Sequence, residues 1–236
     1  EGTTALATSS VYNVTGYYEV QNGSFETPSV TELHSGTNNW QFSNENYKKL
    51  KGAWQTTGTA NASEYSDSEG ADIEIVTTES DNTLDGYSWH GDKIAADGNQ
   101  FAELNCETAG ALYQDVLTTP GEVFLNYQVA HRARGANGDD TSAEEKDTMY
   151  VVAMSSEMAQ NITTQAQVLD VVNNKESYPG AMVATYTDGD RSWTTHQGTY
   201  TVASNQYSTR FFFVAGNTAS NKLTVGNFID NVRFTR

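Results

Sequence analysis

Cysteine, proline and long apolar runs are nearly absent from this sequence, and each absence excludes a class of structure. Among 236 residues there is one cysteine, Cys106, so the domain has no internal disulfide, and there are three prolines. No run of about eighteen apolar residues is present, so we predict no membrane insertion. We interpret Cys106 as a small buried residue rather than a catalytic thiol, because no recognisable motif places a histidine beside it.

Basic residues are also scarce. The 13 lysines and arginines are outnumbered by 30 aspartates and glutamates, and the formal net charge is −17. A surface of that charge repels phosphate backbones and anionic lipids, so we exclude nucleic acid and membrane surfaces as partners. Neutral sugars and divalent cations remain compatible with it.

Residue types that favour strands and turns are abundant. Val, Tyr, Phe and Thr favour strands, whereas Gly, Asn and Ser favour the turns between them. Their alternation predicts an all-β fold of about ten to twelve short strands, with helical turns only near 46–50 and 164–172. We expect a flexible segment or edge strand over 1–20 and a single β-sandwich domain over 21–236. The clearest predicted strands are 24–27, 52–57, 72–76, 99–106, 111–116, 123–134, 148–154, 182–187, 193–202, 207–215 and 226–234.

Two acidic residues stand in apolar surroundings near the ends of the chain. Glu26 follows the turn and ring of N-G-S-F, and Asp230 lies inside the closing strand G-N-F-I-D-N-V-R-F. A buried carboxylate is costly unless a cation, a set of N–H donors or a metal compensates it. First and last strands often lie side by side in β-sandwiches. Glu26 and Asp230 therefore either share one Ca²⁺ or cap backbone N–H groups without metal.

Several segments resemble, in order along the chain, those of a known superfamily. They are N-G-S-F-E at 22–26, G-A-W-Q-T-T at 52–57, D-G-N-Q-F-A-E-L-N at 97–105, A-L-Y-Q-D-V-x-T-T-P-G at 111–121, H-R-A-R-G at 131–135, D-T-M-Y-V at 147–151 and the closing strand. Over most of residues 20–236 the chain resembles the galactose-binding-like jelly-roll superfamily, which contains many carbohydrate-binding modules of bacterial extracellular proteins. More loosely, it resembles modules of the starch-adherence surface proteins of gut anaerobes.

The resemblance implies a jelly-roll β-sandwich with a structural Ca²⁺. In related modules the acid of the opening N-G-x-F-E and the acid of the closing I-D-x-V help to hold this ion. Glu26 and Asp230 occupy those positions here. Carboxylate and backbone carbonyl oxygens are the ligands that Ca²⁺ prefers.

A glycine-bounded stretch, Gly86–Gly91 (G-Y-S-W-H-G), is the predicted sugar-binding site. Tyr87 and Trp89 are two residues apart, so on an extended segment both side chains project to one side. The CH faces of sugars stack on such rings, and His90 or Lys93 would supply hydrogen bonds to hydroxyls. The alternative is that this segment folds its own aromatics inward as a plug.

The residues around each of the other aromatics predict whether its ring belongs to the binding platform or to the core. Three lie in polar stretches and would extend the platform: Trp40, Tyr47 and Tyr65. Trp54 and Trp193 fall in regular strand patterns and are predicted to be core residues.

The outward face of the central strands is a second candidate site, carrying Glu103, Gln128, Arg132 and Arg134. A concave sheet face can hold sugars in jelly-roll modules. We favour instead an ion-pair network of Glu103 or Asp147 with the two arginines. Bidentate pairing of arginine with carboxylate satisfies these groups without a ligand.

Catalytic signatures are missing from the sequence. No nucleophile elbow, H-E-x-x-H or Ser/His/Asp pattern is present. We therefore predict that the protein is not an enzyme but a carbohydrate-binding domain, with an α-glucan such as starch as ligand. The alternatives are a cell-surface adhesin domain that binds a protein or host glycan, and a hydrolase that uses Glu103 and Glu107. The acidity and high Asn and Thr content favour a secreted or cell-surface bacterial protein, monomeric as an isolated domain.

Overall fold

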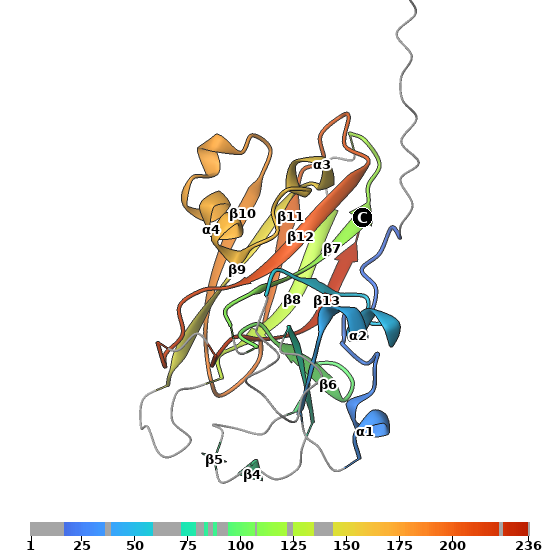
Figure 1. Ribbon diagram of the computed structural model, residues 1–236. Coiled ribbons are helices and arrows are strands. Elements are labelled where there is room, and N and C mark those ends of the chain that lie inside the picture. Colours follow the sequence, from blue (N-terminus) through green and yellow to red (C-terminus); the bar gives the residue numbers. More distant parts are fainter. Residues whose placement is uncertain are drawn as a thin grey trace, which may run out of the picture.

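Two antiparallel β-sheets face each other and carry most of the regular structure (Figure 1). The computed structural model describes residues 17–35, 39–58, 72–78, 83–84, 87–88, 94–106, 108–121, 125–134, 144–221 and 224–235, with the backbone alone at 83–84 and 87–88. The chain passes from one sheet to the other at most of its connections, which is the jelly-roll arrangement. The predicted all-β jelly-roll sandwich is confirmed.

One sheet has six strands and the other has five. Across the six-stranded sheet the order is β1 (Asn39–Phe42), β3 (Ile73–Thr77), β6 (Gln100–Glu103), β13 (Phe228–Thr235), β8 (Leu125–Arg132) and β11 (Thr194–Tyr200). Across the five-stranded sheet it is β10 (Met182–Gly189), β9 (Lys146–Ser155), β12 (Ser208–Ala215), β7 (Ala111–Leu117) and β2 (Gln55–Thr56). A separate hairpin pairs β4 (Thr83–Leu84) with β5 (Tyr87–Ser88).

Within the described ranges, helices are few and short. They are α1 (Val30–Leu33), α2 (Asn44–Lys49), α3 (Ser156–Ala159), α4 (Gln165–Asn173) and the 3₁₀ turn η2 (Lys175–Ser177). The start of α4 is dictated locally, because Thr164 and Gln167 form a reciprocal capping box. Helical turns predicted near 46–50 and 164–172 are confirmed as α2 and α4. None of the helices in the described part of the chain combines the length and apolar character that crossing a membrane requires.

The core fills the space between the two sheets. Ile75, Ala102 and Val129 point inward from the six-stranded sheet, and Phe211 and Phe213 meet them from β12. Trp54 is fully buried among them, as predicted, and its ring packs edge-on against Phe213 at 5.8 Å.

The outer face of the five-stranded sheet carries a second apolar cluster. Phe212 and Val214 point outward from β12 and pack with Val168 and Val171 of α4. Figure 1 shows α3 and α4 on this side of the sheet. Phe211-Phe212-Phe213 is therefore apolar throughout because both faces of β12 are covered.

The opening segment and the closing strand lie side by side, as predicted. Val232 N donates to Gly23 O at 2.9 Å, and a Cβ at Gly23 would collide with Val232 O. The strand predicted over 24–27 is wrong, however. Phe25 has a φ of 57° and Thr27 N donates to Asn22 Oδ1 at 2.9 Å, so a turn closed by an asparagine side chain replaces it.

Candidate functional site

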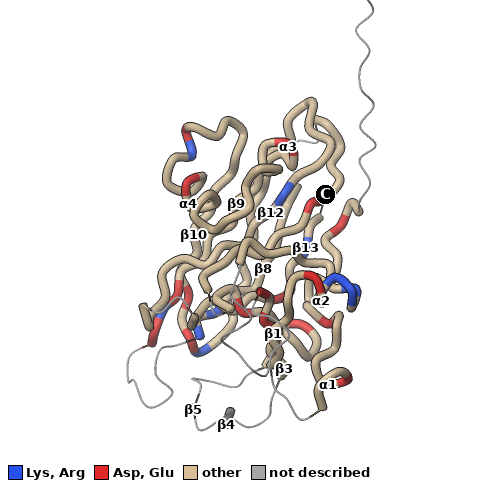
Figure 2. Tube along the Cα trace, viewed as in Figure 1, with Lys and Arg blue, Asp and Glu red and all other residues tan. Residues whose placement is uncertain are grey.

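The outward face of the six-stranded sheet is divided into a closed, charged end and an open, polar end. Cross-strand neighbours point to the same face, so the pairing of Glu74 with Glu103, and of Phe228 with both Glu103 and Arg132, aligns one outward row. Gln128 stands opposite Arg233 and opposite Gln197 in another row. Figure 2 shows acidic and basic residues gathered in the lower part of the sandwich, where the charged end lies.

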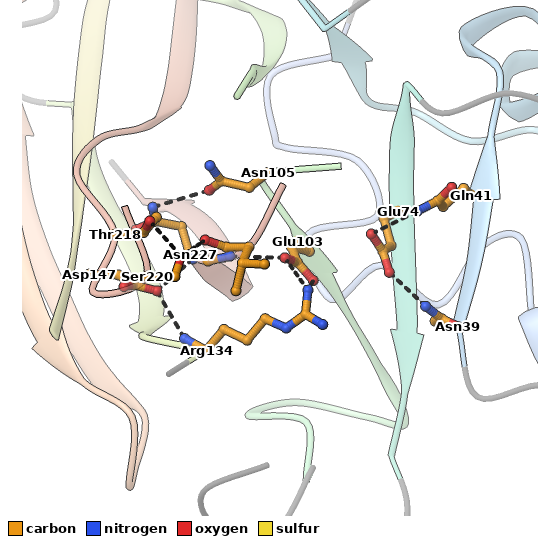
Figure 3. Close-up of polar contacts among 12 residues, drawn as sticks. Asn39, Gln41, Glu74, Glu103, Asn105, Arg134, Asp147, Thr218, Ser220 and Asn227 are labelled. Carbon is orange, nitrogen blue, oxygen red and sulfur yellow. Dashed lines mark hydrogen bonds and ion pairs between the residues drawn. The ribbon is translucent and has the colours of Figure 1, made fainter. Parts of the chain in front are cut away.

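Glu103 is the centre of the closed end (Figure 3). It is 1 % exposed and accepts two hydrogen bonds from Arg134 Nη1, at 2.9 and 3.1 Å, and one from Gly226 N at 3.0 Å. Burial raises the pKa of Glu103 to about 8, against the opposing effect of the Arg134 guanidinium. Neighbouring Glu74 is held by Asn39 Nδ2 at 2.7 Å.

Asp147 fixes the backbone around this cluster. Its carboxylate accepts hydrogen bonds from the backbone N–H groups of Arg134 and Asn227 at 3.0 Å and of Ala219 at 2.8 Å. The predicted ion pair between Arg134 and Glu103 is confirmed, whereas Arg132 Nε donates to the carbonyl of Asp190 at 2.7 Å. At this end, the Glu103 and Asp147 carboxylates thus stabilise the fold by bonding the Arg134 side chain and backbone N–H groups.

The open end presents amides and hydroxyls to solvent. We call it the polar sheet face: Asn126, Gln128, Thr195, Gln197, Thr199 and Arg233. Gln197 Nε2 donates to Gln128 Oε1 at 3.3 Å, and Thr199 Oγ1 donates to Asn126 Oδ1 at 2.9 Å. Planar amides aligned across two strands can bind the hydroxyls of a flat, neutral ligand.

A tryptophan borders this face. Trp193 immediately precedes β11, is half-buried, and packs edge-on against Phe101 at 5.4 Å. Its indole N–H donates to the Ile94 carbonyl at 2.7 Å. Trp193 belongs to a small apolar cluster with Ala95 and Phe101 rather than to the main core between the sheets. The predicted core position is therefore only partly correct.

The residues of the predicted aromatic platform are scattered. Trp89, His90, Lys93 and Tyr65 lie outside the described residues, and Tyr87 lies in β5, where the backbone alone is described. Their role in sugar binding remains a prediction.

Trp40 and Tyr47 are placed clearly. Trp40 is half-buried, and its ring stacks on His34 with centroids 3.4 Å apart, so one of its faces is already occupied. Tyr47 is fully buried on the inner face of α2 and packs against Phe42 at 5.6 Å. The prediction that Tyr47 extends the platform is wrong, because Tyr47 turns its ring into the core.

Glu26 and Asp230 both hold the turn over 96–100. Glu26 Oε1 accepts from Asn99 N at 2.7 Å and Gln100 N at 2.8 Å, and Asp230 Oδ2 accepts from Asp97 N at 2.8 Å. Asp230 is fully buried, and burial raises its pKa to about 7 despite these N–H bonds. Capping of N–H groups is thus present. It accounts for both carboxylates without excluding an ion.

A cavity of about 690 Å³ opens beside Glu26. Hydroxyl and carboxyl groups dominate its lining, which includes Thr27, Ser29, Glu32, Thr77 and Thr78. Gln100 shapes one wall, since its side chain donates to Phe25 O at 2.7 Å and Pro28 O at 2.9 Å and accepts from Val30 N at 2.7 Å. No local sequence signal points to this role of Gln100, because its partners are about seventy residues away in the chain.

Known proteins offer only distant similarity. No protein-family model matches the sequence, and no curated protein matches it. Among solved structures, a CBM4 structure shares 12% identity over 91% of this chain and 97% of that one, with a TM-score of 0.37. TmCBM61 in complex with β-1,4-galactotriose shares 11% identity over 94% and 99%, with a TM-score of 0.34. An arabinose-bound α-L-arabinofuranosidase, MgGH51, shares 9% identity over 92% of this chain but 26% of its own, with a TM-score of 0.43. Each of these is a structure that the chain is similar to in backbone path.

Proposed function

We propose that the domain binds carbohydrate without cleaving it, and that the sugar lies on the polar sheet face. The observation that carries this proposal is the open row of amides and hydroxyls on β8 and β11, flanked by the guanidinium of Arg233. Sugar hydroxyls both donate and accept, and amide side chains match them in both roles. A neutral ligand also suits a chain of net charge −17.

The aromatic part of the proposed site comes from the segment that precedes β6. Tyr87 and Trp89 lie shortly before Ile94, whose carbonyl is bonded to Trp193 Nε1 at 2.7 Å. At full extension, the five residues from Trp89 to Ile94 span at most about 17 Å. Chain connectivity therefore sets an upper limit of about 17 Å on the distance between the Cα atoms of Trp89 and Ile94, and this limit is the basis for including Trp89 in the proposal.

Absence of catalysis is part of the proposal. Glycosidases use a pair of carboxyl groups that face the bond to be cleaved. In the described residues of the closed end, Glu103 and Asp147 are instead buried and bonded to Arg134 and to backbone N–H groups. Glu107 lies outside the described residues.

The ligand class that we propose is an α-glucan such as starch, bound by a domain that is secreted or attached to the cell surface. This choice rests on the sequence resemblance to starch-adherence modules. The tyrosine and tryptophan at 87 and 89 would stack on glucose rings, and the amides of β8 and β11 would bind their hydroxyls.

A structural Ca²⁺ held by Glu26 and Asp230 is a further part of the proposal. The carboxylates flank the same turn, and Glu26 also borders the cavity, so an ion has both hard oxygen donors and a path of entry. Asp230 is fully buried and its pKa is raised, which means that a neighbouring cation would relieve the penalty of its charge. When bound, the ion would pin the opening segment to β13.

Retention on immobilised polysaccharides tests the binding proposal. We expect the wild-type domain to be retained on insoluble starch, and both Trp89→Ala and the double variant Gln128→Ala/Gln197→Ala to be retained less. Lys175→Ala, at an exposed position of η2, is the matched control and should behave as wild type.

Equal retention of all variants would place the site elsewhere. Retention on other glycans but not on starch would overturn only the α-glucan assignment. Binding to proteins without any glycan would favour an adhesin.

A further inference from the structure

Two histidines and one aspartate converge where the edges of the two sheets meet. His131 comes from β8, Asp188 from β10 and His196 from β11. β10 is the edge of the five-stranded sheet and β11 the edge of the six-stranded sheet, so the cluster lies at the seam between them. His131 stands beside Ile229, and His196 beside Val129, both of which point into the core. The three side chains therefore face the interior of the sandwich, on the side of the sheet opposite to the polar sheet face.

All three side chains direct their ligating atoms to one point. His131 Nδ1 and His196 Nε2 each lie 2.6 Å from the same carboxylate oxygen, Asp188 Oδ2. The side chains of His131, Asp188 and His196 are 0%, 8% and 18% exposed, so His196 is the ligand most open to solvent. Burial raises the pKa of Asp188, but the hydrogen bonds from the two imidazoles outweigh it and hold that pKa below its usual value.

The proton on His131 is assigned by its other neighbour. His131 Nε2 lies 2.8 Å from Asn227 Oδ1, and Asn227 Nδ2 in turn donates to Asn105 Oδ1 at 3.3 Å. An amide oxygen only accepts, so His131 Nε2 carries hydrogen. With Nε2 bonded to Asn227, the other ring nitrogen, Nδ1, is the atom of His131 that faces the Asp188 carboxylate and is available to a metal ion.

We propose that His131 Nδ1, His196 Nε2 and the Asp188 carboxylate form a binding site for a divalent transition-metal ion of the zinc class, with water as the fourth ligand. Two imidazoles and one carboxylate are a donor set that such ions take, and the hydrogen bond from His131 to Asn227 is the outer-shell contact that orients a metal-binding histidine. Metal–ligand bonds of about 2.0–2.2 Å put tetrahedral ligand atoms roughly 3.3 Å apart. The two 2.6 Å separations from Asp188 Oδ2 would have to open by roughly 0.7 Å to admit the ion.

A ring contact fixes the orientation of one of the three ligands. Tyr186 stacks on the His196 ring, with centroids 3.9 Å apart, and so holds this ligand in place. Metal bound here would tie β8, β10 and β11 together across the seam.

Metal titration of the purified full chain, stripped with a chelator and then dialysed, tests the inference. We expect one equivalent of Zn²⁺ to bind by calorimetry, Co²⁺ to give the absorption bands of a tetrahedral complex, and Zn²⁺ to raise the melting temperature. A hundredfold excess of Ca²⁺ should not displace the ion, which separates this site from the one proposed at Glu26 and Asp230. Absence of Zn²⁺ binding in the wild type would overturn the inference.

Two histidine variants locate the site. His196→Gln changes the most exposed ligand and should weaken Zn²⁺ binding at least about tenfold and abolish the Co²⁺ bands. His34→Gln is the control, because His34 stacks on Trp40 away from the cluster, and it should bind as wild type. Should His196→Gln fail to fold, imidazole NMR resonances of the wild type provide the second test: Zn²⁺ must shift those of two histidines. Unchanged affinity in His196→Gln, or two unshifted rings, would refute the site.

Discussion

Glu26 and Asp230, from opposite ends of the chain, both accept hydrogen bonds from backbone N–H groups of the turn over 96–100. Glu26 Oε1 accepts from the N–H groups of Asn99 and Gln100, while Asp230 Oδ2 accepts from that of Asp97. Residues 22–26 also contact β13 directly through Gly23 and Val232. The opening segment, the turn before β6 and the closing strand therefore form one unit, whether or not an ion joins it.

Glu26→Gln is expected to destabilise this unit. The amide keeps an accepting oxygen but loses the charge that strengthens two hydrogen bonds, so we expect unfolding free energy to fall by about 1–3 kcal/mol. Urea denaturation measures the change. Glu19→Gln, at an exposed position, is the control and should have no effect beyond about 0.5 kcal/mol. If Ca²⁺ raises the melting temperature of the wild type but not of Glu26→Gln, the metal proposal is supported. No effect of Ca²⁺ on the wild type would contradict it.

Stability should depend on pH through Asp230. Its pKa is raised from 3.8 to about 7 in the folded protein, chiefly by burial. The folded state thus keeps a proton that the unfolded chain has lost, and the contribution of this group to stability falls as pH rises from about 4 to about 7 and then levels off. The unfolding free energy of the wild type minus that of Asp230→Asn, which does not titrate at this position, should therefore fall as pH rises over that range. A difference that is constant with pH would contradict the assignment.

Arg134→Met should be strongly destabilising. It leaves Glu103, which is 1% exposed, without its cation. At a pH above the raised pKa of Glu103, about 8, where the pair is ionised, breaking a buried pair from one side costs about 3–5 kcal/mol. Arg233→Met is the matched control, because the side chains of Arg233 and Asp97 are 57% and 43% exposed and their pair is worth at most about 1 kcal/mol. Chemical denaturation of both variants makes the comparison. Equal losses would show that burial does not govern the value of these pairs.

Gly98→Ala should destabilise the turn more than backbone strain alone explains. Gly98 has a φ of +78°, and a Cβ there would collide with the Glu26 carboxylate. Gly180 has a φ of +84°, with nothing near its missing Cβ, so Gly180→Ala measures the strain by itself. We expect Gly98→Ala to lower the unfolding free energy by at least about 1 kcal/mol more than Gly180→Ala. In a Glu26→Ala background the carboxylate that a Cβ at Gly98 would meet is gone. The losses of unfolding free energy caused by Gly98→Ala and by Gly180→Ala should then become similar.

Most strands and helices could be predicted from the local pattern of apolar, polar and turn-forming residues. The closing strand, the apolar run of β9 and the capping box of α4 each follow from neighbouring residues. Local pattern misled at 24–27, where an asparagine side chain stabilises a turn instead of a strand. It also misled at Tyr47, because polar neighbours hide the fact that one face of α2 is buried.

Residue patterns along the chain were enough to predict the all-β class, most strand positions and the contact between the opening and closing segments. The division of the outward face into a closed charged end and an open polar end, and the meeting of His131 with Asp188 and His196, became visible only in the folded protein. His131 and Asp188 are 57 residues apart in the chain, and they meet because strands pair and sheets stack over long distances. Which strand edges meet depends on the packing of the whole core, so no local pattern encodes it.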